Sequence, residues 1–159
     1  RCCISKTIRV VTIMIMASPH FSIDELTFSE TATRHGIDNT ANGNALDNLY
    51  KTARGMENVR TVLNDSPIYI SSGYRCLDLN TILGSKPTSS HIAGLACDFT
   101  CQRFGSPREI VLAIIKSKID YDQIILEYER WVHISFSKYK EDPKKQSLII
   151  TKSGTIPFK

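Results

Sequence analysis

The sequence predicts an α+β fold in which N-terminal helices pack on a small, mostly antiparallel sheet. Three observations predict it: helical periodicity in the first 63 residues, short strand-like runs from residue 67 onward, and a hairpin signal at residues 121–137. The chain has 159 residues, of which 42% are hydrophobic, so it has the size of one domain and enough apolar residues for a core.

Three helices are expected before residue 64. Ser22-Ile23-Asp24-Glu25 has the pattern of a capping box, which opens a short helix. A second short helix is expected over residues 29–35, because Gly36 is a typical stop signal. The longest helix is expected over residues 46–63, where apolar side chains recur at helical spacing and form one face: Leu46, Leu49, Tyr50, Ala53, Met56 and Leu63.

The rest of the chain is expected to mix strands with two short helices. In order, these are a strand over residues 67–73, a helix over 77–83, a strand over 95–101, a helix over 106–117, strands over 121–127 and 131–137, and an edge-like strand over 147–151. Ser106-Pro107-Arg108-Glu109 is a second capping box, with proline at the first helical position. Three residues separate the strands over 121–127 and 131–137, and this spacing predicts a hairpin.

Residues 1–16 are interpreted as a separate segment and residues 17–159 as the domain. The segment has a basic start and an apolar run over residues 10–17, which is too short to span a bilayer. This pattern fits an N-terminal extension, which we favour, or a weak signal peptide. No membrane span is expected.

Charge and cysteine content narrow the class of protein. The net charge of +4 favours an anionic surface such as a cell wall only weakly, and no basic run is interleaved with aromatic residues, so nucleic-acid binding is not expected. None of the five cysteines forms a C-x-x-C pair, and Cys97 and Cys101 lie too far apart along one strand to bridge easily. Free thiols in a reducing compartment are therefore expected.

Two histidines and one aspartate carry the candidate chemistry. Asp98 follows His91 by 7 residues, and His133 follows Asp98 by 35 residues. Zinc prefers such nitrogen and oxygen ligands, and three protein ligands leave one coordination position for water. His91, Asp98 and His133 are therefore candidate zinc ligands, although a histidine is more often an ordinary surface or core residue.

Glu127 and Glu129 are the candidates for a general base. Trp131 and His133 share one face of their strand, because side chains two residues apart do so. With a three-residue loop, Glu127 lies opposite Trp131 and diagonal to His133, at roughly 7 Å between backbones. A two-residue loop would turn Glu127 to the other face. Glu129 also has even spacing from His133 but lies at the hairpin tip, so Glu127 is favoured.

Three residues are candidate substrate contacts. Arg75 follows Ser72-Gly73-Tyr74 at a strand end, and its guanidinium suits a carboxylate, the alternative being a surface ion pair. Ser90 either binds substrate or shapes its loop. Trp131 either lines a cleft or belongs to the core.

These residues resemble the motifs of the zinc D-Ala-D-Ala carboxypeptidase and murein endopeptidase family, in the short single-domain form common in phages. The resemblance covers about residues 19–137. It rests on His20-Phe21-Ser22-Ile23-Asp24-Glu25-Leu26, Ser72-Gly73-Tyr74-Arg75, Leu79-Asn80, Ser89-Ser90-His91-x-x-Gly94-x-Ala96-x-Asp98, Asp122-Gln123-x-Ile125-x-Glu127 and Trp131-Val132-His133-x-Ser135. The scaffold also resembles the signalling domain of hedgehog proteins.

The resemblance implies a site with zinc bound by three ligands: His91, Asp98 and His133. It implies Glu127 as general base, and Arg75 as a binder of a substrate carboxylate or carbonyl that also helps to hold the oxyanion. The chain departs from the family at two places. Several relatives have the base three residues before the second histidine, where this chain has Arg130, and the loop over residues 81–88 lacks the usual double glycine.

The expected function is hydrolysis of peptidoglycan stem peptides by a metal-activated water, in a monomeric zinc carboxypeptidase or endopeptidase. The alternative is a non-catalytic, zinc-stabilised module that binds cell wall or protein. We expect a phage lysis protein that acts in the host cytoplasm and then in the periplasm or cell wall, or from the virion. A secreted bacterial enzyme is the alternative.

Overall fold

The computed structural model describes residues 14–138 and 141–159. The elements in chain order are α1 (Ile23–Thr27), α2 (Glu30–His35), α3 (Gly43–Val62), β1 (Tyr69–Ser72), α4 (Leu77–Ile82), β2 (Ala96–Thr100), α5 (Pro107–Lys116), β3 (Gln123–Glu127), β4 (Trp131–Ser135), β5 (Gln146–Thr151) and β6 (Gly154–Pro157). The predicted extension or signal peptide falls almost wholly on residues 1–13, which lie outside the described residues.

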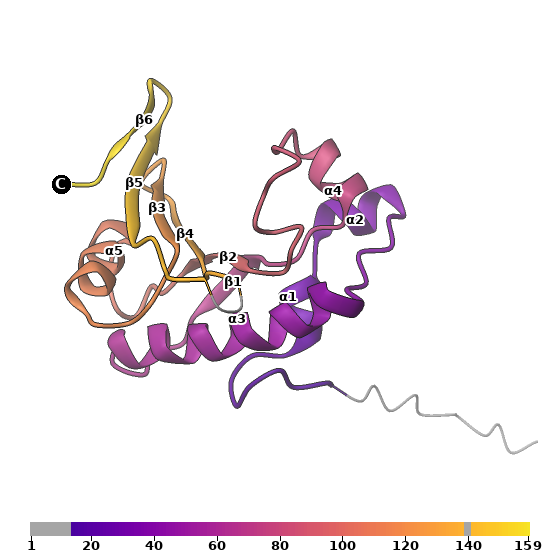
Figure 1. Cartoon of the computed structure of the whole chain (residues 1–159), viewed down its shortest axis with the longest axis horizontal. Coiled ribbons are helices and arrows are strands. Elements are labelled where there is room, and N and C mark those ends of the chain that lie inside the picture. Colours follow the sequence, from indigo (N-terminus) through magenta and orange to yellow (C-terminus); the bar gives the residue numbers. More distant parts are fainter. Residues whose placement is uncertain (1–13, 139–140) are drawn as a thin grey trace, which may run out of the picture.

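The six strands form one sheet in the order β1-β2-β4-β3-β5-β6. Neighbouring strands are antiparallel except β3 and β5, which run parallel. In Figure 1, α3 runs beneath the sheet, α5 lies beside it, and α2 and α4 stand beyond the β1 end. The predicted α+β class, with helices on a mostly antiparallel sheet, is confirmed.

The prediction of an edge-like strand at residues 147–151 is wrong. This segment is β5, an interior strand that pairs with β3 on one side and with β6 on the other. Strand β6 was not predicted; its four residues begin with glycine and end with proline. Both residue types are rare in strand interiors, so the segment does not have the pattern of a strand.

Helix starts follow the capping signals in the sequence. The Ser22 and Ser29 side chains accept hydrogen bonds from the third residue of α1 and α2, and Gly36 ends α2 with a left-handed φ of 61°. The Ser106–Glu109 capping box of α5 is complete. Helix α3 begins at Gly43, three residues earlier than predicted. The prediction began too late because Gly43 and Asn44 are exposed and carry no apolar periodicity.

The core lies between α3, α5 and one face of the sheet. The predicted apolar face of α3 is confirmed at Leu49, Ala53 and Met56, which are fully buried. Alternate residues of the central strands, such as Phe99 and Ile134, belong to the same core. Because side chains alternate along a strand, their neighbours in sequence point to the opposite face, where the candidate site lies.

The described cysteines are free thiols, as predicted. Cys97 and Cys101 are buried, and burial raises the pKa of the Cys97 thiol far above its usual range, so this thiol stays protonated. Among residues 14–138 and 141–159, no helix has the length and apolar content needed to cross a bilayer.

The turn that carries His91 is fixed on α3. The Asn48 side chain donates to the Ala93 carbonyl and Thr52 Oγ1 donates to the Gly94 carbonyl, each at 2.8 Å. Gly94 has a φ of +71°, and a Cβ there would lie 2.4 Å from the Ala45 carbonyl oxygen of α3. Glycine is therefore required at this point for two separate reasons, the backbone conformation and the close approach.

We expect Gly94→Ala to lower the free energy of unfolding by about 2–5 kcal/mol, since it combines left-handed strain with a backbone clash. Gly84→Ala is the matched control, because Gly84 also has a positive φ of +67° but has open space around it. In that control only the left-handed strain is introduced, so the free energy of unfolding should fall by about 1–2 kcal/mol. Urea unfolding of both variants measures the difference, and equal losses would contradict the clash.

Candidate metal centre

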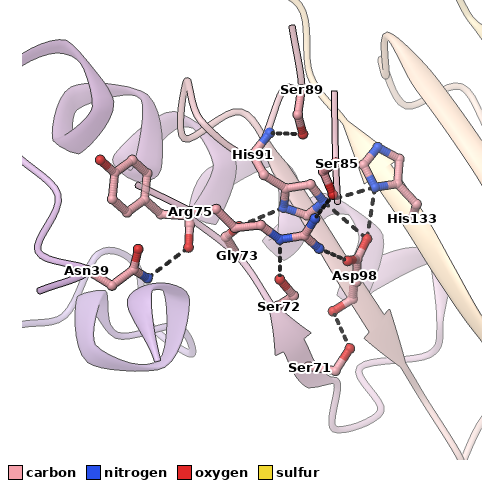
Figure 2. A network of polar contacts seen from close by, with 11 residues as sticks. Asn39, Ser71, Ser72, Gly73, Arg75, Ser85, Ser89, His91, Asp98 and His133 are labelled. Carbon is pink, nitrogen blue, oxygen red and sulfur yellow. Dashed lines mark hydrogen bonds and ion pairs between the residues drawn. The ribbon is translucent and has the colours of Figure 1, made fainter. Parts of the chain in front are cut away.

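His91, Asp98 and His133 converge on one point at the face of the sheet opposite the core, as Figure 2 shows. His91 Nε2 lies 3.2 Å from His133 Nδ1 and 3.2 Å from Asp98 Oδ1, and His133 Nδ1 lies 2.8 Å from Asp98 Oδ1. All three residues are buried, with exposures of 3%, 7% and 8%. Residues far apart in the sequence therefore present three ligand atoms to one position.

The spacing of these atoms suits zinc. Tetrahedral bonds of about 2.0–2.1 Å place neighbouring ligand atoms about 3.3 Å apart, which is close to the separations found here. Two imidazole nitrogens and one carboxylate oxygen also match the donor types that zinc prefers. The residues present fit a zinc ion with three protein ligands.

Strand pairing sets two of the three ligands. Asp98 on β2 lies directly opposite His133 on β4 in the antiparallel register. Opposite side chains share one face of the sheet at about 4.5–5.5 Å between Cβ atoms. The third residue, His91, enters from the turn that is fixed on α3. The order of the strands thus explains how residues 35 positions apart in sequence become neighbours.

A carbonyl group orients His91. Its Nδ1 lies 2.6 Å from the Gly73 carbonyl oxygen, and because a carbonyl only accepts, Nδ1 carries the proton and Nε2 has the free lone pair. Burial lowers the pKa of His91, and the neighbouring His133 and Arg75 lower it further against the raising effect of Asp98, which favours the neutral ring that a metal requires. Gly73 itself has no space for a side chain, since a Cβ would lie 2.2 Å from the Leu26 carbonyl oxygen.

Asp98 is ionised in its buried position. Burial alone would raise the pKa of its carboxyl, but the adjacent His91 and His133 rings hold the pKa well below its usual range. Its second oxygen, Oδ2, accepts a hydrogen bond from Arg75 Nη2 at 2.6 Å. The structure thus places Arg75 beside the ligand set and in contact with one member of it (Figure 2).

The hairpin register brings Glu127 to the same face. Glu127 pairs with Trp131 across a three-residue loop, as predicted, and it lines the same cleft as the three candidate ligands. Burial raises the pKa of the Glu127 carboxyl and Asp98 raises it further, while His133 and Arg75 partly offset this. A half-buried carboxyl with a raised pKa beside a candidate metal site suits a general base.

Glu129 lies elsewhere. Its side chain is 53% exposed and forms an ion pair with Arg108 on α5, away from the cleft. Arg108 Nε also lies 3.3 Å from its second carboxylate oxygen. The alternative base of the sequence analysis is therefore not brought to the ligand set.

The cleft around the site has a volume of about 880 Å³. Its lining includes Arg75, His91, Asp98 and His133, and residues of the loop between α4 and His91, among them Ser90. Residues of β3, β4 and β5 and of the β3–β4 turn also line it, including Ile125, Tyr128, Trp131 and Ile150. The rings of Tyr128 and Trp131 lie 5.7 Å apart between centroids. Both Ser90 and Trp131 thus reach the cleft.

Sequence reasoning missed Asn39, which holds the segment that carries Arg75. Its side-chain amide donates to the carbonyls of Thr27 at 2.7 Å and Tyr74 at 3.0 Å, and its oxygen accepts from the Cys76 amide at 2.8 Å. Nothing in the sequence distinguishes this asparagine from ordinary loop residues. The Ser-Gly-Tyr-Arg motif draws attention to Gly73 in the sequence. Only the fold shows that the Gly73 carbonyl orients the His91 ring.

Comparison with known proteins bears on the same residues. No curated protein sequence matches the chain. A sequence model of the family described as Peptidase M15 matches residues 19–135, a span that includes the three candidate ligands, Glu127 and Arg75. Because the match covers well over half of the chain, the protein belongs to the peptidase M15 family.

Proposed function

We propose that this protein is a zinc peptidase that hydrolyses the stem peptides of peptidoglycan, as a carboxypeptidase or an endopeptidase. The observation that carries the proposal is the buried His91, Asp98 and His133 group beside Glu127 in one open cleft. Membership of the peptidase M15 family supports peptide hydrolysis with zinc. The assignment to peptidoglycan rests on the motif resemblance to murein peptidases.

Different residues of the chain have different roles in the proposed reaction. Bound zinc would supply Lewis acidity, which polarises the scissile carbonyl and makes water a nucleophile near neutral pH. Glu127 takes the proton from the attacking water and later donates it to the leaving amine. Its position diagonal to His133 places it close to the ligand set without binding there. Ser90 and Trp131, which both line the cleft, are the proposed substrate contacts.

Glu127→Gln should keep zinc binding but lower kcat by about 10²–10⁴, because the amide cannot accept the proton. Turnover of purified peptidoglycan and metal content by mass spectrometry measure the two effects separately. The matched control is Glu129→Gln, which removes an exposed carboxylate outside the cleft and should leave kcat unchanged. Loss of zinc in the Glu127 variant, or loss of activity in the control instead, would contradict the assigned base.

Removal of the metal should abolish digestion of peptidoglycan, and added zinc should restore it. Mass spectrometry of the released fragments identifies the new ends and so the bond that is cut. Intact peptidoglycan after incubation with folded protein that holds one zinc per chain would contradict the proposed peptidase function. That outcome would favour a module that binds the cell wall without cutting it.

A further inference from the structure

The Arg75 side chain contacts three different parts of the site. Its Nε donates to Ser72 Oγ at 3.0 Å, its Nη1 to Ser85 Oγ at 3.3 Å and its Nη2 to Asp98 Oδ2 at 2.6 Å. Each nitrogen of the guanidinium therefore has an acceptor within the protein. The backbone amide of Arg75 also donates to the His91 carbonyl at 3.2 Å. Arg75 thus links β1, the wall of the cleft and two of the three candidate ligand residues (Figure 2).

The two oxygens of Asp98 have separate partners. Oδ1 faces the imidazoles, at 2.8 Å from His133 Nδ1 and 3.2 Å from His91 Nε2, whereas Oδ2 faces Arg75. A contact to the second oxygen of a carboxylate restricts its rotation, and a charge-assisted hydrogen bond is stronger than a neutral one. The Arg75 contact therefore fixes which oxygen, and which lone pair, is presented to a metal.

Burial decides whether Arg75 is free to serve the substrate. The Arg75 side chain is 13% exposed and that of Asp98 is 10% exposed. Turning the guanidinium toward a substrate carboxylate would leave Asp98 Oδ2 without a donor in a buried position, which is unfavourable even with a metal on Oδ1. Of the two cations that line the cleft, Arg75 and Lys86, it is Lys86 that is exposed.

We propose that Arg75 is a positioning residue for the metal site, which acts through Asp98, and that it is not the receptor of a substrate carboxylate. The proposal departs from the role that the family resemblance implies for this arginine. The metal-binding part is independent of the proposed peptidase function, whereas the substrate part rests on it.

The first test is zinc affinity in Arg75→Gln and Arg75→Lys, measured by competition with a chromophoric chelator. We expect Arg75→Gln to weaken binding by about 10–100-fold, the usual effect of removing a partner of a metal ligand. Arg75→Lys should recover part of the loss, because an ammonium reaches Asp98 but cannot hold Ser72 and Ser85 in the same way. The visible spectrum of the cobalt-loaded proteins should change in Arg75→Gln, since it reports the ligand geometry directly.

The matched control is Arg60→Gln, which removes a second arginine–aspartate pair, 3.2 Å long, between α3 and Asp65 far from the cleft. It should leave both zinc affinity and the cobalt spectrum unchanged, and so separates a local effect from general loss of stability. If Arg75→Gln does not fold, the double variant Ser72→Ala/Ser85→Ala keeps the arginine but removes two of its anchors. That variant should also bind zinc more weakly than the unaltered protein.

The second test compares two peptides of one sequence, one with a free C-terminus and one amidated. The ratio of their kcat/KM values should be the same in Arg75→Lys as in the unaltered protein. Unchanged zinc affinity together with a shifted ratio would overturn the inference and assign Arg75 to the substrate. If neither peptide nor peptidoglycan is cut by the zinc-loaded protein, the proposed function fails while the affinity test still decides the role of Arg75.

Discussion

The buried carboxylate of Asp98 is the constraint on which the site depends. An ionised carboxylate in a sheet loses its hydration, and this is unfavourable by several kcal/mol unless charged or hydrogen-bonding partners replace the water. Here Arg75 donates to one oxygen and His133 lies within hydrogen-bond distance of the other. Compensation of one charge therefore brings a strand and a strand end together, and His91 completes the ligand set from its turn.

Those segments are in turn held by the rest of the fold. The His91 turn is fixed on α3 by Asn48 and Thr52, and the Arg75 segment is held by Asn39. These contacts are hydrogen bonds from side chains to backbone carbonyls in buried or partly buried positions, and the carbonyls would lose a partner if the side chains were removed. The precision of the ligand set thus depends on polar side chains of the N-terminal helices and their connections, and the hydrophobic core only supports it.

Local patterns in the sequence predicted most of the elements but not their arrangement. Ser22, Ser29 and Ser106 mark helix starts through bonds within one turn, so the sequence alone reveals them. That Glu127 and His133 lie on the same face of the sheet also follows from one hairpin. The position of β5, the contact between Arg75 and Asp98 and the role of Asn39 depend on partners remote in sequence, for which periodicity gives no signal.

The β3–β4 turn shows how backbone geometry outside the site controls a side chain inside it. Tyr128 and Glu129 both have left-handed backbones, with φ of 51° and 59°, at an intrinsic cost of about 1–2 kcal/mol each in residues other than glycine. Three contacts offset this strain: the Tyr128 amide bonds the Ile150 carbonyl at 2.9 Å, its ring packs on Trp131, and Glu129 pairs with Arg108.

The length of this turn decides which face Glu127 occupies, because a change of one residue would move its side chain to the other side of the sheet. The Glu129 side chain itself pairs with Arg108 on α5, and because both side chains are largely exposed this ion pair contributes little. Its even spacing from His133, which made it a rival base in the sequence, does not determine where it points. What places Glu127 and not Glu129 in the cleft is the three-residue length of the turn, which sets the register Glu127↔Trp131.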